Sequence, residues 1–299
     1  MVASLRELRQ RRQSVTSTQK ITRAMELIAS SRIVKSQRAA AQALPYTHAL
    51  NRAVAAVAAH SRHGAPHPLL ADAGDVKRVA VFFITSDRGM NGAYSSNAIR
   101  AATQMTQRIL DEGQEPVRYV MGRKGITYLK FRGIPAEASW EGFSDAPTYD
   151  RAVEISDRLV ADFLKPADEG GVDEIWAIYT RMRSMISQVV HVRRILPLEV
   201  VEGSEDTSGD GPIPLYEFEP DPETVLDSLL PLYVRSRIWF YLLQSAASQL
   251  ASQQRAMKSA TDNADQLIDR LTREANQARQ AEITQEINEI VSGANALTQ

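Results

Sequence analysis

Residues 240–278 read "FYLLQSAASQLASQQRAMKSATDNADQLIDRLTREANQA", and the spacing of the apolar residues in this stretch decides the fold. Mostly apolar or small residues recur at alternating steps of three and four, and the same series extends back to residue 226. That alternation is the 3.5-residue repeat of a coiled coil. The series comprises Leu226, Leu229, Tyr233, Ser236, Phe240, Leu243, Ala247, Leu250, Gln254, Met257, Thr261, Ala264, Ile268, Leu271, Ala275 and Ala278. The stretch therefore predicts one long coiled-coil helix.

The predicted C-terminal helix covers residues 221–297. Asp221 fits the N-cap, Pro222 suits the first helical position, and Glu223 complements the positive end of the helix dipole. At 1.5 Å per residue, a helix of this length would span roughly 110 Å. That is far longer than a globular domain of this size, so we expect the helix to extend beyond any compact core.

A second long helix is predicted at the other end of the chain, over residues 1–60. No proline or glycine occurs before Pro45, which is a candidate kink. Because one helix enters the central region and the other leaves it, their pairing is predicted to be antiparallel. The apolar seam of the first helix is less regular and contains a three-residue slip. The seam runs through Leu5, Leu8, Arg12 and Val15, and then through Thr18, Ile21, Met25, Ile28 and Arg32.

The central region, residues 76–215, alternates strand-like and helix-like stretches. The strand-like stretches "VKRVAVFFITSD", "EPVRYVMG", "VDEIWAIYT" and "SQVVHVRRILPL" are rich in Val, Ile, Phe and Tyr. Between them, "SSNAIRAATQMTQRILDEG" and "TYDRAVEISDRLVADFL" carry apolar residues at helical spacing. This alternation predicts a Rossmann-like α/β domain with a mostly parallel sheet. The acidic, glycine-bearing residues 203–211 are interpreted as a loop.

Composition excludes several functional classes. No stretch approaches eighteen uncharged apolar residues, so a transmembrane helix is not expected, and the absence of cysteine excludes disulfides and thiolate metal sites. The net charge of -1 argues against a general nucleic-acid binder. Residues 6–38 are strongly basic but have no interleaved aromatic residue, so an acidic protein partner is expected there instead of nucleic acid. We expect neither a metal site nor a cofactor.

The stretch "TSDRGMNGAYSSN", residues 85–97, is a candidate phosphate-binding turn because it joins a strand to a helix and contains two glycines. It lacks the spacing and the lysine of a P-loop, and it lacks the three glycines of the dinucleotide fingerprint. We therefore interpret it as a tight turn, and we predict no catalytic residue in the chain. Two alternatives remain open: a small α/β nucleotide-binding enzyme with helical oligomerisation arms, and a coiled-coil scaffold.

Three stretches together resemble one family, the gamma subunits of F-type ATP synthases. They are residues 5–32, "LRELRQRRQSVTSTQKITRAMELIASSR"; the turn at residues 85–97; and residues 257–297, "MKSATDNADQLIDRLTREANQARQAEITQEINEIVSGANAL". The resemblance covers the order and the size of all three regions. Many relatives have a cysteine where Asn91 stands here. Since the first motif begins near Met1, we expect a bacterial source.

The resemblance implies a central stalk. Family members insert an antiparallel coiled coil of both termini into the bore of the alpha and beta hexamer, with the α/β domain outside as a foot. The foot meets the epsilon subunit and the c-subunit ring, and one copy rotates in each complex, coupling proton flow to ATP synthesis without a catalytic site of its own. The expected location is the cytoplasmic face of the bacterial cell membrane, peripheral to it.

The resemblance also implies roles for individual residues, each weighed against a plain structural role in the coiled coil. The uncharged tip from Val291 to Leu297 would lie in an apolar sleeve. The expected contacts with the beta subunit are Arg279, Gln280, Thr284, Lys20, Arg23 and Met25. Tyr216 and Glu219 would face the epsilon subunit and the c ring, and Asp87, Arg88 and Asn91 are candidate subunit contacts in the turn.

Overall fold

The computed structural model describes residues 4–60, 69, 74, 76–166, 169–198, 219 and 221–297. Helix α1 spans Leu5–His60 and helix α5 spans Pro222–Leu297, and both pass through two compact units. We call residues 1–29 with 254–299 the end unit, and residues 30–253 the sheet unit. Each unit is described by itself.

The sheet unit contains five strands in the order β3-β2-β1-β4-β5. The first four are parallel, and β5 is an antiparallel edge strand beside β4. The mostly parallel sheet and its four predicted strands are confirmed. The short strand β3 was not predicted, because three residues are too few to carry a periodic signal. The strands are β1 (Arg78–Ile84), β2 (Glu115–Met121), β3 (Ala138–Trp140), β4 (Glu174–Met182) and β5 (Gln188–Leu196).

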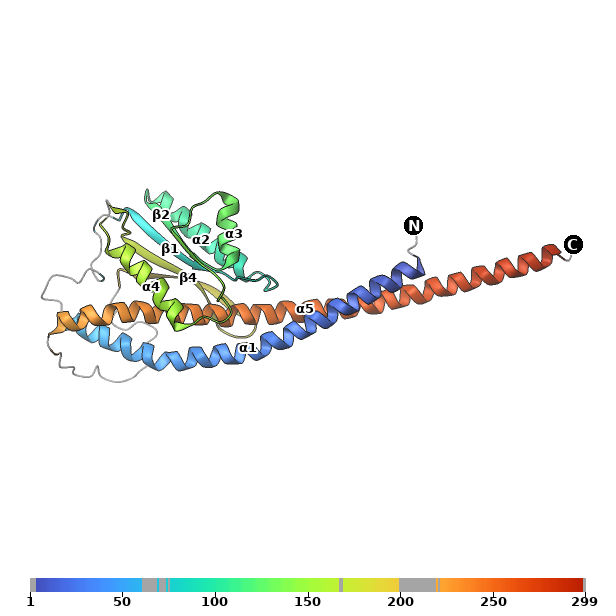
Figure 1. Cartoon of the computed structure of the whole chain (residues 1–299), viewed down its shortest axis with the longest axis horizontal. Coiled ribbons are helices and arrows are strands. Elements are labelled where there is room, and N and C mark those ends of the chain that lie inside the picture. Colours follow the sequence, from blue (N-terminus) through green and yellow to red (C-terminus); the bar gives the residue numbers. More distant parts are fainter. Residues whose placement is uncertain are drawn as a thin grey trace. The chain divides into compact units, whose positions relative to one another are not determined.

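Helices cover both faces of the sheet, as Figure 1 shows. Helices α2 (Tyr94–Asp111) and α3 (Arg123–Arg132) lie on one face, and α4 (Tyr149–Leu164) lies on the other. The first face buries a core that includes Val81, Phe83 and Ile109, and the second buries a larger core shared with α1 and α5. The predicted Rossmann-like layering is therefore present.

Within the sheet unit, α5 is buried on more than the predicted stripe. Leu230, Val234 and Ile238 have no exposed surface, whereas the predicted seam residues Leu229 and Tyr233 are only partly buried. The reason is that α5 contacts the sheet layer as well as α1, so that burial spreads around the helix. A two-helix seam alone is too narrow a description of this part of α5.

In the end unit the predicted α5 seam is confirmed, with Met257, Thr261, Ala264, Leu271 and Ala275 all buried. Gln19 donates to Asp265 at 3.1 Å and the Thr22 hydroxyl lies 2.8 Å from that of Thr261, so residue numbers rise along α1 as they fall along α5. The predicted antiparallel pairing is therefore present in this unit. The sheet unit repeats the arrangement with Thr47 and Ser236, whose hydroxyls are 3.0 Å apart.

The predicted three-residue slip in α1 is wrong. Ile21 and Ile28 are 61% and 54% exposed, whereas Thr22 and Ala29 are buried. From Val15 to Leu50 the buried and partly buried positions follow one another at steps of three and four without this slip, and several of them carry small or hydroxyl side chains. The prediction followed the largest apolar residues, but the contact between two close helices selects side chains that fit between them.

The start of α5 and the course of α1 agree with the sequence signals. The Asp221 carboxylate accepts the Thr224 N–H at 2.9 Å, which confirms the N-cap. Helix α1 continues through Pro45. Among the described residues, no helix combines the length and the apolarity needed to cross a membrane.

Candidate functional site

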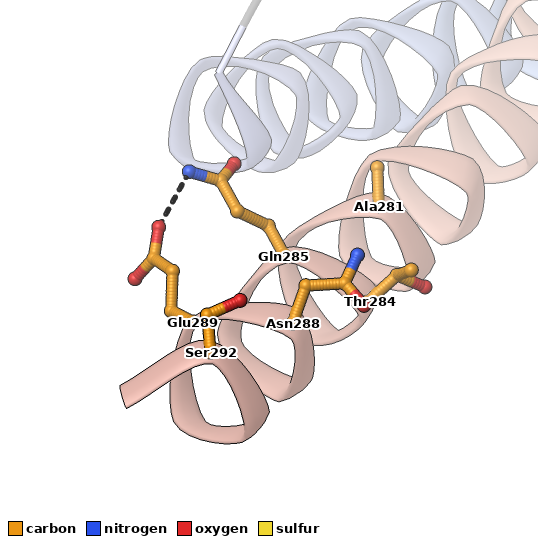
Figure 2. Close-up of a pocket in the computed structure, with 6 residues that line it drawn as sticks. All are labelled: Ala281, Thr284, Gln285, Asn288, Glu289 and Ser292. Atoms are coloured by element: carbon orange, nitrogen blue, oxygen red, sulfur yellow. Dashed lines mark hydrogen bonds between the residues drawn. The ribbon is translucent and has the colours of Figure 1, made fainter. Parts of the chain in front are cut away.

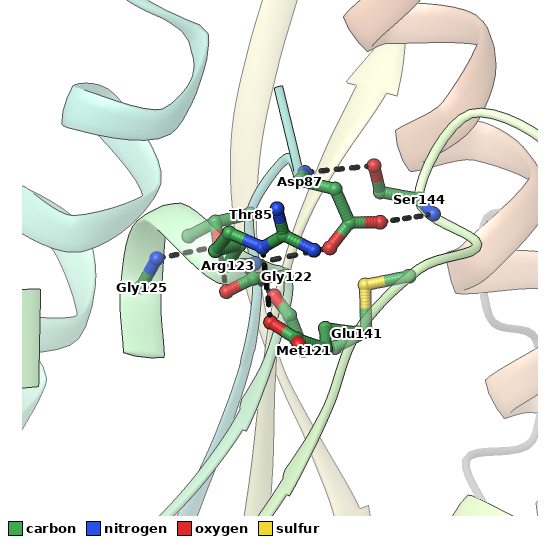
Figure 3. A network of polar contacts seen from close by, with 8 residues as sticks. All are labelled: Thr85, Asp87, Met121, Gly122, Arg123, Gly125, Glu141 and Ser144. Atoms are coloured by element: carbon green, nitrogen blue, oxygen red, sulfur yellow. Dashed lines mark hydrogen bonds and ion pairs between the residues drawn. The ribbon is translucent and has the colours of Figure 1, made fainter. Parts of the chain in front are cut away.

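The turn after β1 is held by hydrogen bonds to the end of β2. The Thr85 hydroxyl donates to the Met121 carbonyl at 2.9 Å and accepts the Gly125 N–H at 2.9 Å. Gly122 has a φ of 98°, and a Cβ atom there would lie 2.3 Å from the Thr85 carbonyl oxygen. The ends of the parallel strands β1 and β2 therefore lie too close together for any side chain at residue 122, and Figure 3 shows Thr85 beside Gly122.

Asp87 connects the turn to the loop that follows β3 (Figure 3). Its carboxylate accepts the Arg123 N–H at 3.1 Å and the Ser144 N–H at 2.9 Å, while its own N–H donates to the Ser144 hydroxyl at 2.9 Å. Burial alone would raise the pKa of Asp87, but backbone hydrogen bonds from Ser144, Gly142 and Arg123 outweigh it and lower the pKa. Asp87 is therefore an ionised structural acceptor.

A second network closes the other side of the turn. The Ser86 hydroxyl lies 2.7 Å from the Ser95 hydroxyl and accepts from the Asn91 side-chain amide at 2.8 Å. Asn91 is 5% exposed. Arg88 is exposed, and its carbonyl accepts from the Ser86 hydroxyl at 2.8 Å. Of the three candidate contacts in the turn, only Arg88 is an exposed residue.

Helix α5 bonds to the carboxyl end of β4, beside the place where an open α/β sheet is expected to bind a ligand. Such sheets bind ligands where the strand order reverses, which here is at the carboxyl ends of β1 and β4. At that end of β4, the Thr180 N–H donates to the Ser245 hydroxyl at 3.3 Å, and the Ser248 hydroxyl donates to the Thr180 carbonyl at 3.0 Å. Together with the two inward-facing networks, this arrangement does not resemble a nucleotide cradle.

The predicted contacts on α1 lie in the end unit and differ in exposure. Lys20 and Arg23 are exposed and stand one helical turn apart, and Arg23 pairs with Glu26 at 3.3 Å. Met25 is only partly buried. These residues present two cations and part of a thioether to the surface, which is the composition expected for contact with an acidic partner.

The predicted contacts on α5 lie beyond the last buried seam residue. Arg279, Gln280 and Thr284 are all exposed, and the Thr284 hydroxyl donates to the Gln280 carbonyl at 2.9 Å. Every residue from 279 to 292 is exposed in the described chain. Four of them are large and apolar, and all four fall within nine positions of α5: Ile283, Ile287, Ile290 and Val291.

We call residues 279–292 the bare end of α5. A shallow recess lies along it, as Figure 2 shows. All of its lining residues belong to this one helix, so it is a groove along a helix surface with no opposing wall: Ala281, Thr284, Gln285, Asn288, Glu289 and Ser292. Gln285 donates to Glu289 at 2.9 Å along the groove. We therefore interpret it as part of an exposed face and not as a small-molecule site.

The two predicted foot residues are only partly covered by the structure. Glu219 is exposed, and Tyr216 lies outside the described residues. Of the predicted uncharged tip, Val291 to Leu297, the side chains of Val291 and Ser292 are described, and both are exposed.

Sequence reasoning missed a link between α1 and the turn. Arg32 pairs with Asp145 at 2.7 Å, and Asp145 follows Ser144, which bonds to Asp87. No local signal could have revealed this pair, because its members are far apart in the sequence and each lies among ordinary surface residues. It ties the Asp87 network to α1 within the sheet unit.

Comparisons with known proteins agree on one family. A family model described as ATP synthase matches residues 4–297. The chain is 55% identical to the ATP synthase gamma chain of Cutibacterium acnes, covering 100% of this chain and 98% of that protein, and 54% identical to that of a Nocardioides species, covering 99% and 97%.

Solved structures give the same fold. A chain of the Euglena gracilis mitochondrial ATP synthase, from a structure of OSCP, F1 and the c-ring, has a TM-score of 0.65 at 15% identity, covering 98% of this chain and 94% of that one. A rotor chain of the same enzyme has a TM-score of 0.61 at 14% identity, covering 93% and 98%. Since similarity runs the full length of both the chain and its bacterial relatives, the chain belongs to the ATP synthase gamma chain family.

Proposed function

We propose that this chain is the central-stalk gamma subunit of a bacterial proton-translocating ATP synthase. It rotates within the alpha and beta hexamer and couples proton flow through the c-subunit ring to ATP synthesis. The observation that carries the proposal is full-length similarity to gamma chains, combined with the bare end of α5. An isolated helix with a row of exposed isoleucines is a poor terminus in water, and a surrounding protein would cover it.

The chain contributes no catalytic side chain in this proposal. The alternative, a nucleotide-binding α/β enzyme, would use the turn at residues 85–92. Against it, the Ser86 hydroxyl, the Asn91 amide and the Asp87 carboxylate are already bonded inside the turn, and α5 occupies the end of β4. The proposed chemistry therefore belongs to the surrounding hexamer, and the chain transmits torque.

The proposed contacts with the beta subunit are on the end unit. Arg279 and Gln280 are exposed hydrogen-bond donors on α5, with Thr284 one turn further on. Lys20 and Arg23 would attract acidic segments of beta in an orientation-dependent way, and the partly buried Met25 would provide packing; the full set is Arg279, Gln280, Thr284, Lys20, Arg23 and Met25. Since these side chains are surface groups, they can change partners as the stalk turns.

The proposed contacts of the sheet unit are with other subunits. Arg88 is the exposed member of the turn, and Asp87 and Asn91 shape its backbone. Glu219 and Tyr216 would face the epsilon subunit and the c ring. One copy per complex would lie at the cytoplasmic face of the cell membrane, attached through the complex and not through lipid.

Reconstitution tests this function. The full chain is mixed with alpha and beta subunits of a bacterial relative, and complex mass and ATPase turnover are measured. We expect a complex with one copy of this chain per hexamer and a turnover that depends on it. A chain that self-associates and leaves the hexamer unchanged would support the scaffold alternative, and tight nucleotide binding by the isolated chain would support the enzyme.

A double variant tests the contact residues. Arg279→Ala with Gln280→Ala should lower turnover by about threefold or more, since that corresponds to losing only about 0.7 kcal/mol at the rate-limiting step. The matched control is Arg273→Ala with Gln277→Ala, on exposed positions of the same helix. Equal turnover in both variants would remove the assigned contact while leaving the family assignment intact.

A further inference from the structure

Apart from Glu174 at the start of β4, the charged residues of the β4 and β5 hairpin are all basic. Residues 175–198 contain four arginines and a histidine but no aspartate or glutamate. Arg194 pairs with Glu174 at 3.3 Å, at the end of β4 away from the turn. Arg181, Arg183 and Arg193 are exposed, and the ion pairs of the described residues include none of them. The hairpin is therefore a local cationic surface on a chain whose net charge is close to zero.

The turn at the hairpin tip is tightly bonded and displays an apolar side chain. The Ser184 hydroxyl accepts the N–H groups of Ile186 and Ser187 at 3.3 and 3.0 Å. The Gln188 side-chain amide donates to the carbonyls of Ser184 and Met185 at 3.0 and 3.1 Å. Ile186 is nevertheless 79% exposed. A fixed backbone thus presents an apolar residue to solvent, an arrangement that lowers the entropy cost of binding.

The two strand ends next to the hairpin tip are anchored in the sheet unit. Met182 packs against Ile33, Leu250 and Ala251. The Ser252 hydroxyl donates to the Gln188 side-chain oxygen at 3.3 Å, which ties the start of β5 to α5. The backbone next to the exposed tip is therefore held against α1 and α5.

His191 lies on β5 near the three arginines of the hairpin. Its ring stacks on Tyr179 with centroids 5.6 Å apart. The pKa of His191 is lowered, first by burial and then by Arg193, Arg181 and Arg183. In the β4 and β5 register Tyr179 is opposite His191, so Arg181 and Arg193, each two positions away, flank that pair on one face of the hairpin, and Arg183 follows in the turn.

We propose that the hairpin patch, residues 181–193, is a docking surface for an acidic segment of a partner protein. Carboxylates of that segment pair with Arg181, Arg183 and Arg193, and an apolar side chain covers Ile186. None of the contacts proposed above lies in this patch, so the proposal goes beyond the stalk function and does not depend on rotation.

Guanidinium groups bind carboxylates and phosphates alike, so the amount of exposed apolar surface decides between a protein and a lipid partner. A lipid surface would be expected to need more exposed apolar side chains than Met185 and Ile186 supply.

The absence of cysteine gives a direct test. Ile186→Cys creates the only thiol of the chain, which is labelled with a benzophenone maleimide, and the full chain is photocrosslinked in the assembled membrane complex. We expect a crosslink to a partner segment rich in Asp and Glu. Triple reversal, Arg181→Glu, Arg183→Glu and Arg193→Glu, should lower the yield about tenfold, because attraction becomes repulsion. The matched Arg→Lys triple variant should retain most of it.

Other outcomes would overturn the proposal. One is the absence of any crosslink. Another is a crosslink to lipid, to residues 199–217 of this chain, or to a segment poor in Asp and Glu. The third is a crosslink yield that charge reversal leaves unchanged. Because all three arginines are exposed, the variants should fold, and circular dichroism of each purified chain verifies this. The crosslink is scored independently of ATPase turnover, so a failed stalk function and a failed docking surface are distinguishable.

Discussion

Replacing Asp87 with alanine tests whether the turn after β1 is a structural junction. The change removes the acceptor of two backbone N–H groups, from Arg123 at 3.1 Å and Ser144 at 2.9 Å. Leaving the N–H of the buried Ser144 unpaired costs about 1 to 2 kcal/mol, whereas the N–H of the exposed Arg123 can bond water, so the free energy of unfolding should fall by about 1.5 to 2.5 kcal/mol. Asp87→Asn keeps one acceptor oxygen and should lose about half as much.

Urea denaturation followed by tryptophan fluorescence measures this loss in the relevant part of the chain. All three tryptophans, Trp140, Trp176 and Trp239, belong to the sheet unit. If Asp87→Ala lowers the free energy of unfolding by less than about 0.5 kcal/mol, the size of an ordinary surface change, then the network does not hold the turn.

The pH dependence supplies a second readout of the same carboxylate. The pKa of Asp87 is lowered below its ordinary value of 3.8, so its stabilisation is complete above that pH and is lost as the pH falls through the folded-state pKa. The wild-type chain should therefore lose more stability than Asp87→Asn on acidification below about pH 4. Parallel curves for the two proteins would contradict the assignment of Asp87 as an ionised acceptor.

Two further predictions use the same urea assay. Gly122→Ala should lower the free energy of unfolding by about 3 kcal/mol or more, because its Cβ would lie 2.3 Å from the Thr85 carbonyl. The control Gly113→Ala, at a φ of 77° and with no atom within 4 Å, should lower it by only about 1 kcal/mol. Equal losses would show that the contact at residue 122 relaxes. Ile33→Ser in the α1 seam should cost about 3 kcal/mol and Val34→Ser, an exposed neighbour, under about 0.5 kcal/mol; similar losses would contradict the unbroken seam.

The sequence predicts those elements whose signal is local and repeated. The C-terminal helix repeats its pattern over sixteen seam positions, and the strands before Asp87 and after Gln114 are runs of apolar β formers, so both kinds of element appear as predicted. The N-cap at Asp221 is likewise a local feature. The α1 seam was misread because it is built from residues such as Thr22 and Ala29, whose burial depends on the opposite helix.

The candidate site was less accessible to sequence reasoning. The turn at residues 85–97 could be separated from nucleotide motifs by spacing alone, but its bonds to Ser144 and Met121 join segments far apart in the chain. The cationic hairpin was read only as a strand, because exposure and the lack of ion pairs become visible only in three dimensions. Whether Arg279, Gln280 and the other predicted contacts meet a partner stays a prediction.

The bare end of α5 has a consequence for how the helix forms. An isolated helix of this length is marginal in water, because starting a helical turn fixes several residues for one hydrogen bond. Residues 279–292 avoid that step, since they extend a helix already ordered by its buried seam up to Ala275. The helical state of residues 279–292 thus depends on the buried seam before them, and their amide hydrogen exchange should become faster from residue 279 toward the tip. A substitution that loosens Leu271 should speed exchange along the whole bare end, although none of those residues would have changed.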